Sequence, residues 1–250
     1  MAPAINRHPG DVNHRPRDAE FGAFNAEQVR DRIDRYEPDI LWNDINWPDE
    51  AKNFDPDGLG TVFNEFYERV PHGVVNDRFG VSHADYLTTE YEVTLGREEA
   101  ERPWENCRGL GYSFGYNQVE DERHYLSGRQ AAMALVDVVS RGGHLLLNVG
   151  PRADGTLPPL QQQALVELGK WMQSGPKELL KRARPASLDG IAVPDNAWGA
   201  IEKDGQRHVF VDVAGHEREA VGAVLDVAID GATHTVDLPA GRPGPVMLSN

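Results

Sequence analysis

The sequence predicts an α/β fold followed by a small antiparallel β region. Between residues 25 and 175, short apolar segments alternate with amphipathic helical segments, as in folds whose parallel strands are buried on both faces. From about residue 186 the helical period disappears, and short apolar runs are separated by turn dipeptides such as Asp-Gly. We therefore expect a tail or loop over 1–24, an α/β domain over 25–180 and a β domain over 181–250.

Four helices are expected in the α/β region. Asn25 and Gln28 have the spacing of a capping box, and the helix that they begin ends before Pro38. The second helix has apolar residues at i, i+3, i+4, i+7 and i+11, namely Leu59, Val62, Phe63, Phe66 and Val70. Further helices are predicted over 127–141 and 159–174.

Strands are predicted over 39–43, 73–77, 85–93, 111–116 and 144–151. A closed (β/α)8 barrel needs about eight strands, so about five indicate either a partial (β/α)8-type barrel or an open sheet.

Composition excludes several classes of function. The formal charge is −15, from 25 basic and 40 acidic residues, so nucleic acid and anionic membrane are not expected partners. The single cysteine, Cys107, excludes an internal disulfide framework and a cysteine-based zinc site. No segment approaches the roughly 18 apolar residues of a membrane helix. The first residues contain no apolar signal segment, so we expect a cytoplasmic, bacterial protein.

Four acids lie at or just after predicted strand ends, where α/β folds place their ligand sites: Asp44, Asp77, Glu90 and Asp154. Asp77 is readily interpreted as a cap or a partner of Arg78, and Asp154 as a turn residue before a glycine.

The other two acids are flanked by aromatic residues. Asp44 lies between Trp42 and Trp47, and Glu90 lies beside Tyr86 and Tyr91. Two carboxyl groups with aromatic platforms suit glycoside hydrolysis, in which one acid attacks the anomeric carbon and the other protonates the leaving oxygen.

Five motifs in order strengthen this interpretation: "PDILWNDINWP", "VVNDRFG", "TTEYEV", "WENCRGLGYSFGYN" and "GGHLLLNVGPRADGTL". Together they resemble the C-terminal half of the catalytic barrel of the retaining α-L-fucosidases, glycoside hydrolase family 29. The resemblance extends over about residues 25–175. It implies a partial (β/α)8-type barrel followed by a β-sandwich.

The resemblance also implies roles for individual residues. The acid of "LWND", here Asp44, corresponds to the nucleophile, and the acid of "TTEY", here Glu90, to the general acid/base. Arg78, Trp42 and Phe114 match positions of the fucose pocket, and Phe114 suits the 6-methyl group. Trp47 is a further candidate for substrate binding.

The retaining mechanism requires different charge states of the Asp44 and Glu90 carboxyl groups. Asp44 must be ionised to attack, so it needs a nearby cation, which Arg78 can provide. Glu90 must begin protonated and then act as a base on water. A retaining mechanism requires carboxyl groups about 5–5.5 Å apart. It requires no metal or organic cofactor.

The expected partner is a fucosylated glycan or oligosaccharide. The resemblance covers neither the first half of the barrel nor its adjacent pair of sugar-binding histidines, so we expect a homo-oligomer that completes the barrel or pocket. Exposed strand edges and an apolar face would favour such self-association. Two alternatives stay open: a non-catalytic carbohydrate-binding remnant, and a related retaining glycosidase that resembles an α-L-galactosidase.

Overall fold

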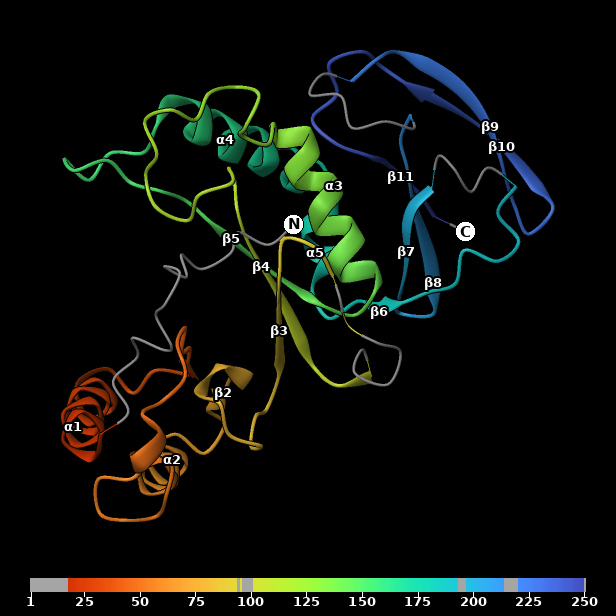
Figure 1. Ribbon diagram of the computed structural model, residues 1–250. Helices are drawn as coiled ribbons and strands as arrows, with labels where there is room; N and C mark the ends of the chain where they lie inside the picture. The colour runs from red at the N-terminus through yellow and green to blue at the C-terminus, as the bar shows by residue number, and fades with distance from the viewer. Residues whose placement is uncertain (1–17, 94, 96–100, 193–196, 214–219, 250) are drawn as a thin grey trace, which may run out of the picture. The chain divides into compact units, whose positions relative to one another are not determined.

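The computed structural model describes residues 18–93, 95, 101–192, 197–213 and 220–249 (Figure 1). The chain divides into two compact units, Met1–Thr88 and Thr89–Asn250.

The first unit alternates helices with short parallel strands. Strands β1 and β2 are paired in parallel, with Ile40 opposite Val74 and Leu41 opposite Val75. An isolated parallel bridge between Asn76 and Tyr86 lies beyond β2. In chain order the elements are α1 (Ala19–Tyr36), β1 (Ile40–Leu41), the 3-10 helix η1 (Asp49–Ala51), α2 (Leu59–Arg69), β2 (Val74–Val75) and the 3-10 helix η2 (Asp77–Phe79).

Helix α1 begins at Ala19, earlier than the Asn25 start that the sequence pattern predicts. Asp18 is its N-cap, and the Asp18 carboxylate accepts a hydrogen bond from the Phe21 amide at 2.7 Å. The last part of the expected 1–24 loop is therefore helical, and residues 1–17 lie outside the described residues.

The predicted apolar face of α2 forms the centre of the first unit's core. Leu59, Val62, Phe63 and Phe66 are all buried, together with Val75 of β2. Phe63 contacts Phe79 edge-on, with ring centroids 4.9 Å apart. This core supports the segments that follow β1 and β2.

Strand β3 (Leu87–Glu90) leads from the first unit into the second, where the sheet order is β3-β4-β5. Strands β4 and β5 are paired in parallel, with Cys107 opposite Leu146. The remaining elements are β4 (Trp104–Gly109), α3 (Gly128–Ser140), β5 (His144–Asn148), α4 (Pro159–Gln173) and α5 (Pro176–Leu180). The mixed α/β character is confirmed, whereas closure into a partial barrel stays a prediction.

The predicted strand over 111–116 is wrong, because the strand in this region is β4, which ends at Gly109. Tyr112 and Ser113 donate their backbone N–H groups to the Glu120 carboxylate, so these groups do not join a sheet. The aromatic residues of this segment lie on a loop that follows a parallel strand.

All regular structure in the described part of the C-terminal region is β, and β6 begins just after the boundary expected near residue 181. An antiparallel sheet of order β11-β8-β7-β6 and the β9-β10 hairpin enclose an aliphatic core that includes Val209, Val211, Val227, Ile229 and Leu238. The strands are β6 (Arg184–Pro185), β7 (Ala197–Lys203), β8 (Gln206–Val211), β9 (Ala223–Ile229), β10 (Ala232–Leu238) and β11 (Val246–Ser249).

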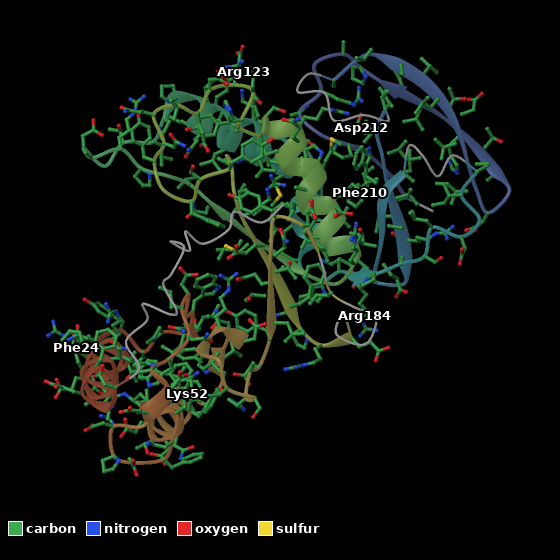
Figure 2. All side chains as sticks on the ribbon, in the orientation of Figure 1. Phe24, Lys52, Arg123, Arg184, Phe210 and Asp212 are labelled. Atoms are coloured by element: carbon green, nitrogen blue, oxygen red, sulfur yellow. The ribbon has the colours of Figure 1, made fainter. Side chains whose placement is uncertain are left out.

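The β region packs directly on α3 and α4 within the second unit. Phe210 of β8 lies in one cluster with Val136 of α3 and Trp171 of α4 (Figures 1 and 2). The Trp171 indole N–H donates to the Pro245 carbonyl at 2.9 Å. The β strands thus support the helices that flank β4 and β5.

A buried ionic cluster centred on Asp212 joins α3 to the β region (Figure 2). Asp212 is completely buried, and Arg129 Nε on α3 lies 3.0 Å from its Oδ2 atom. Arg242 forms an ion pair with the other carboxylate oxygen. Burial lowers the pKa of the Arg242 guanidinium. The carboxylate therefore neutralises two cations that would otherwise be costly to bury.

None of the helices in the described residues combines the length and apolar character that a membrane span requires.

Replacing Asp212 with Ala is expected to lower the free energy of unfolding by about 3–5 kcal/mol, because two guanidinium groups lose their buried partner. Urea denaturation of the variant measures the change. Asp237→Asn is the control, since Asp237 is exposed on β10. An equal free energy of unfolding in the two variants would contradict the proposed contribution of the Asp212 cluster to stability.

Candidate active site

Asp44 lies just after β1 and is held by Arg78. The Arg78 Nη1 atom donates to Asp44 Oδ1 at 3.0 Å, and the Asp44 side chain is 70% exposed while that of Arg78 is 16% exposed. Arg78 also lies over the Trp42 ring, with its guanidinium carbon 4.8 Å from the ring centroid. The three predicted site residues of the first unit therefore form one group with an accessible carboxylate.

Two asparagines lock the segment that carries Asp44. The Asn43 amide N–H donates to Asn76 Oδ1 at 3.1 Å, and the Asn76 side-chain amide donates to the Asn43 carbonyl at 2.8 Å. The side chain of Asn43 also donates to the Arg78 carbonyl at 2.9 Å. Since Asn76 is fully buried, these bonds fix the segment after β1 to the segment after β2.

Thr88 orients the guanidinium of Arg78. The Arg78 Nε atom donates to the Thr88 hydroxyl at 2.9 Å, and that hydroxyl donates to Asp77 Oδ1 at 2.7 Å. Asp77 thus acts through Thr88 on the orientation of Arg78. The sequence analysis did not identify Asn43, Asn76 and Thr88 as site residues. The only indication in the sequence is that each is a polar residue directly after or within a short strand.

In the second unit, Glu90 is the last residue of β3 and is partly exposed. The next residue, Tyr91, has a φ of 54°, a left-handed conformation that is uncommon for a residue with a side chain. Its ring lies 5.4 Å from that of Phe114, and its hydroxyl donates to the Gly111 carbonyl at 3.2 Å. Tyr91 therefore connects the end of β3 to the loop that carries Phe114.

Arg108 of β4 also contacts the Tyr91 ring, with its guanidinium carbon 5.5 Å from the ring centroid. Burial lowers the pKa of the Arg108 guanidinium. Burial likewise raises the pKa of the Tyr91 phenol, so Tyr91 stays neutral and acts as a hydrogen-bond donor.

The loop over 111–120 is anchored at two points. Glu120 Oε1 accepts from the amides of Tyr112 at 3.0 Å and Ser113 at 2.8 Å. The Asn148 side-chain amide, at the end of β5, donates to the Phe114 carbonyl at 2.6 Å. Phe114 is partly buried as a result, and neither Glu120 nor Asn148 was a candidate from the sequence.

Two other sequence candidates have structural roles. Asp154 accepts from the Thr156 amide at 2.9 Å in a turn, and bonding to Thr156 lowers the pKa of the Asp154 carboxyl. Trp47 is only 3% exposed and packs on Phe79, with ring centroids 6.1 Å apart. The expectation that Trp47 binds substrate is therefore corrected: it is a core residue that supports the segment after Asp44.

The site residues fall into two groups, Asp44 with Trp42 and Arg78 in the first unit and Glu90 with Phe114 in the second. Within the residues that the structure describes, no cluster of three or more histidine, cysteine or acidic side chains has the geometry of a metal site.

A carboxylate after a strand end, held by a guanidinium beside an aromatic ring, is an arrangement that suits a carbohydrate-active protein. Residues 4–176 match the family model described as Alpha-L-fucosidase, so the chain belongs to the α-L-fucosidase family.

Individual relatives agree with the family match. The chain is 30% identical over 152 residues to an α-L-fucosidase of Dictyostelium discoideum, covering 58% of this chain and 32% of that protein. It is 32% identical over 157 residues to the tissue α-L-fucosidase of Bos taurus, covering 60% and 33%. The chain thus spans about a third of the length of these curated relatives.

Solved structures show the same relationship. The Thermotoga maritima α-fucosidase in complex with fucose is 37% identical, with a TM-score of 0.68, and the match covers 82% of this chain and 46% of that one.

Replacing Glu120 with Ala is expected to increase amide hydrogen exchange at Tyr112 and Ser113 by about tenfold or more, because both amides lose a charged acceptor. Exchange measured by mass spectrometry or NMR tests this expectation. The neighbouring exposed residue provides the control Glu122→Ala, which should leave both amides protected. Unchanged exchange in the Glu120 variant would show that other contacts hold the loop.

Proposed function

We propose that this chain carries the nucleophile, the acid/base and part of the sugar pocket of a retaining exo-α-L-fucosidase. One observation carries the proposal: the exposed Asp44 carboxylate is held by Arg78 beside Trp42, at the end of a parallel strand, in a chain of the α-L-fucosidase family. Carboxylates so placed are accessible to a ligand at the strand ends.

The reaction proceeds in two displacements. In the first, an Asp44 carboxylate oxygen attacks the anomeric carbon, the glycosidic bond breaks, and Glu90 gives its proton to the leaving oxygen. In the second, Glu90 takes a proton from water, the water oxygen attacks the anomeric carbon, and the ester bond to Asp44 breaks. The Arg78 guanidinium keeps Asp44 oriented and returns to it when the carboxylate reforms.

The sugar is recognised by one cation and by aromatic rings. Arg78 donates to a sugar hydroxyl, Trp42 presents an aromatic face, and Phe114 contacts the 6-methyl group. The related Thermotoga maritima protein was solved in complex with fucose, which supports fucose as the ligand. The partly buried position of Phe114 against Tyr91 supports an apolar contact at this point.

Replacing Asp44 with Ala is expected to reduce kcat for para-nitrophenyl α-L-fucoside on the order of 1000-fold or more, because the attacking oxygen is removed. Added azide should restore turnover by attacking in its place. Asp31→Ala, an exposed acid on α1, is the control and should retain activity. An Asp44 variant with normal activity would disprove this role, and faster cleavage of the α-L-galactoside by the wild type would disprove the fucose assignment.

Replacing Glu90 with Gln is expected to slow cleavage of a fucosyl disaccharide about 100-fold or more, because its leaving oxygen needs a proton. The bond-breaking step with para-nitrophenyl fucoside should be affected far less, since para-nitrophenolate leaves without protonation. Pre-steady-state kinetics with both substrates measure the difference. An equal loss on the two substrates would contradict the acid role.

We also propose that the chain self-associates. Strand β5 is at the edge of the β3-β4-β5 sheet, and its Leu146 is 40% exposed, whereas parallel sheets are normally covered on both faces. A second copy packed on this face would bury Leu146 and the apolar surface around it.

Light scattering is expected to give a mass above that of the 27.7 kDa monomer, and Leu146→Lys should reduce it by placing a charge on the covered face. Val166→Lys, on the exposed side of α4, is the control. An active monomer at low concentration would contradict this proposal.

A further inference from the structure

The loop after β4 forms an open hollow next to Phe114. The hollow has a volume of about 500 Å³ and is lined by Ser113, Gly115, Tyr116, Asn117 and Gln118. Its lining therefore includes both chain neighbours of Phe114, and it lies entirely in the second unit. None of the residues in the proposed fucose pocket lines it.

Tyr116 presents an aromatic ring at this hollow. The residue is 45% exposed, and the guanidinium carbon of Arg152, from the loop after β5, lies 5.9 Å from its ring centroid. An arginine in this position holds a ring by cation–π attraction without burying it. A large aromatic surface thus stays in contact with solvent while its orientation is restrained.

Hydrogen bonds and a close backbone contact restrain the loop that forms the hollow. The Asn117 side-chain amide donates to the Ser113 hydroxyl at 3.0 Å, and Asn117 Oδ1 accepts from the Val119 amide at 3.1 Å. A Cβ atom at Gly150 would lie 2.7 Å from the Tyr116 nitrogen, so the two loops touch directly at a glycine. The bond from Asn148 to the Phe114 carbonyl fixes the same segment to the end of β5. A preorganised loop pays little ordering entropy when a ligand binds.

These groups suit the recognition of a pyranose. An aromatic face packs against the axial C–H groups of a sugar ring, and the amide of Gln118 and the hydroxyl of Ser113 are hydrogen-bonding groups of the kind that pair with sugar hydroxyls. Since the hollow adjoins Phe114, a sugar held there would be next to the fucosyl unit.

We propose that this hollow binds the sugar to which the terminal fucosyl residue is attached, with Tyr116 as its stacking platform. The inference rests on the proposed fucosidase function, because that function supplies the neighbouring fucose. Arg152 is a positioning residue that holds the Tyr116 ring. The hollow thereby selects between glycans that share a terminal fucose.

Binding measurements on the whole chain test the proposal. The Asp44→Asn variant, in which the proposed nucleophile is removed so that substrate is expected to stay intact, is titrated with L-fucose and with fucosyl disaccharides of galactose or N-acetylglucosamine in (1→2), (1→3) and (1→6) linkage. At least one disaccharide should bind more tightly than fucose. Adding Tyr116→Ala should raise the Kd of that disaccharide about tenfold, the loss of one stacking contact, and leave the Kd of fucose unchanged.

Graded variants separate stacking from folding. Tyr116→Phe keeps the ring and should bind like the parent, whereas Tyr116→Leu keeps the bulk and should bind like Tyr116→Ala. Tyr112→Ala is the matched control, since Tyr112 is an exposed tyrosine of the same loop outside the hollow. The proposal is overturned if no disaccharide binds more tightly than fucose, or if Tyr116→Leu binds as well as Tyr116→Phe.

Turnover distinguishes this proposal from the function on which it rests. The chain with Asp44 intact is assayed with α-L-fucosyl fluoride, which has no attached sugar. Absence of hydrolysis, together with selective loss of disaccharide binding in Tyr116→Ala, would reject the fucosidase function and retain the sugar-binding hollow. Equal loss of fluoride and disaccharide hydrolysis in Tyr116→Ala would overturn the hollow's role and retain the function.

Discussion

The ion pair between Arg78 and Asp44 is the interaction on which the candidate site depends. One guanidinium contacts the carboxylate, the Trp42 ring and the Thr88 hydroxyl, so a single side chain from the segment after β2 contacts both the segment after β1 and Thr88 of β3. The pair is exposed on the Asp44 side, which limits its contribution to stability. In the proposed mechanism its contribution is orientation, because the ion pair holds the Asp44 carboxylate in one position.

Hydrogen bonds between polar side chains fix the segments that follow the short strands. Strands of two residues, as in β1 and β2, offer few backbone hydrogen bonds. The reciprocal amide bonds between Asn43 and Asn76 add to this pairing where the strands end. In the second unit Glu120 and Asn148 perform the same task for the loop that carries Phe114. In both groups, polar side chains that are not themselves site candidates hold the candidate site residues in place.

Sequence patterns predicted the parts of this architecture that depend on local periodicity. The apolar spacing of Leu59, Val62, Phe63 and Phe66 predicted α2 and its buried face, and both are present. The proximity of Arg78 to Asp44 was also expected and is observed, because both residues follow parallel strands. The strand predicted over 111–116 was wrong, since the Glu120 carboxylate captures amides that a strand would have used.

The remaining features depend on contacts between distant parts of the chain. Trp47 looked like a platform beside Asp44, yet it is in the core against Phe79 because the segment turns inward after Asp44. Asn43, Asn76 and Asn148 gave no distinctive pattern, because one asparagine after a strand has the same local signature whether it bonds across the fold or faces water. The buried cluster around Asp212 likewise joins Arg129 of α3, Asp212 directly after β8, and Arg242 of the loop between β10 and β11.

The central claim is that Asp44 forms the bond to the sugar, and covalent trapping tests it most directly. The chain is incubated with 2-deoxy-2-fluoro-α-L-fucosyl fluoride, digested, and analysed by peptide mass spectrometry. We expect the mass of one fluorofucosyl group on the peptide that contains Asp44, at the Asp44 carboxylate itself. A label on Glu90 or on any other residue, or substrate turnover without a label, would contradict the account.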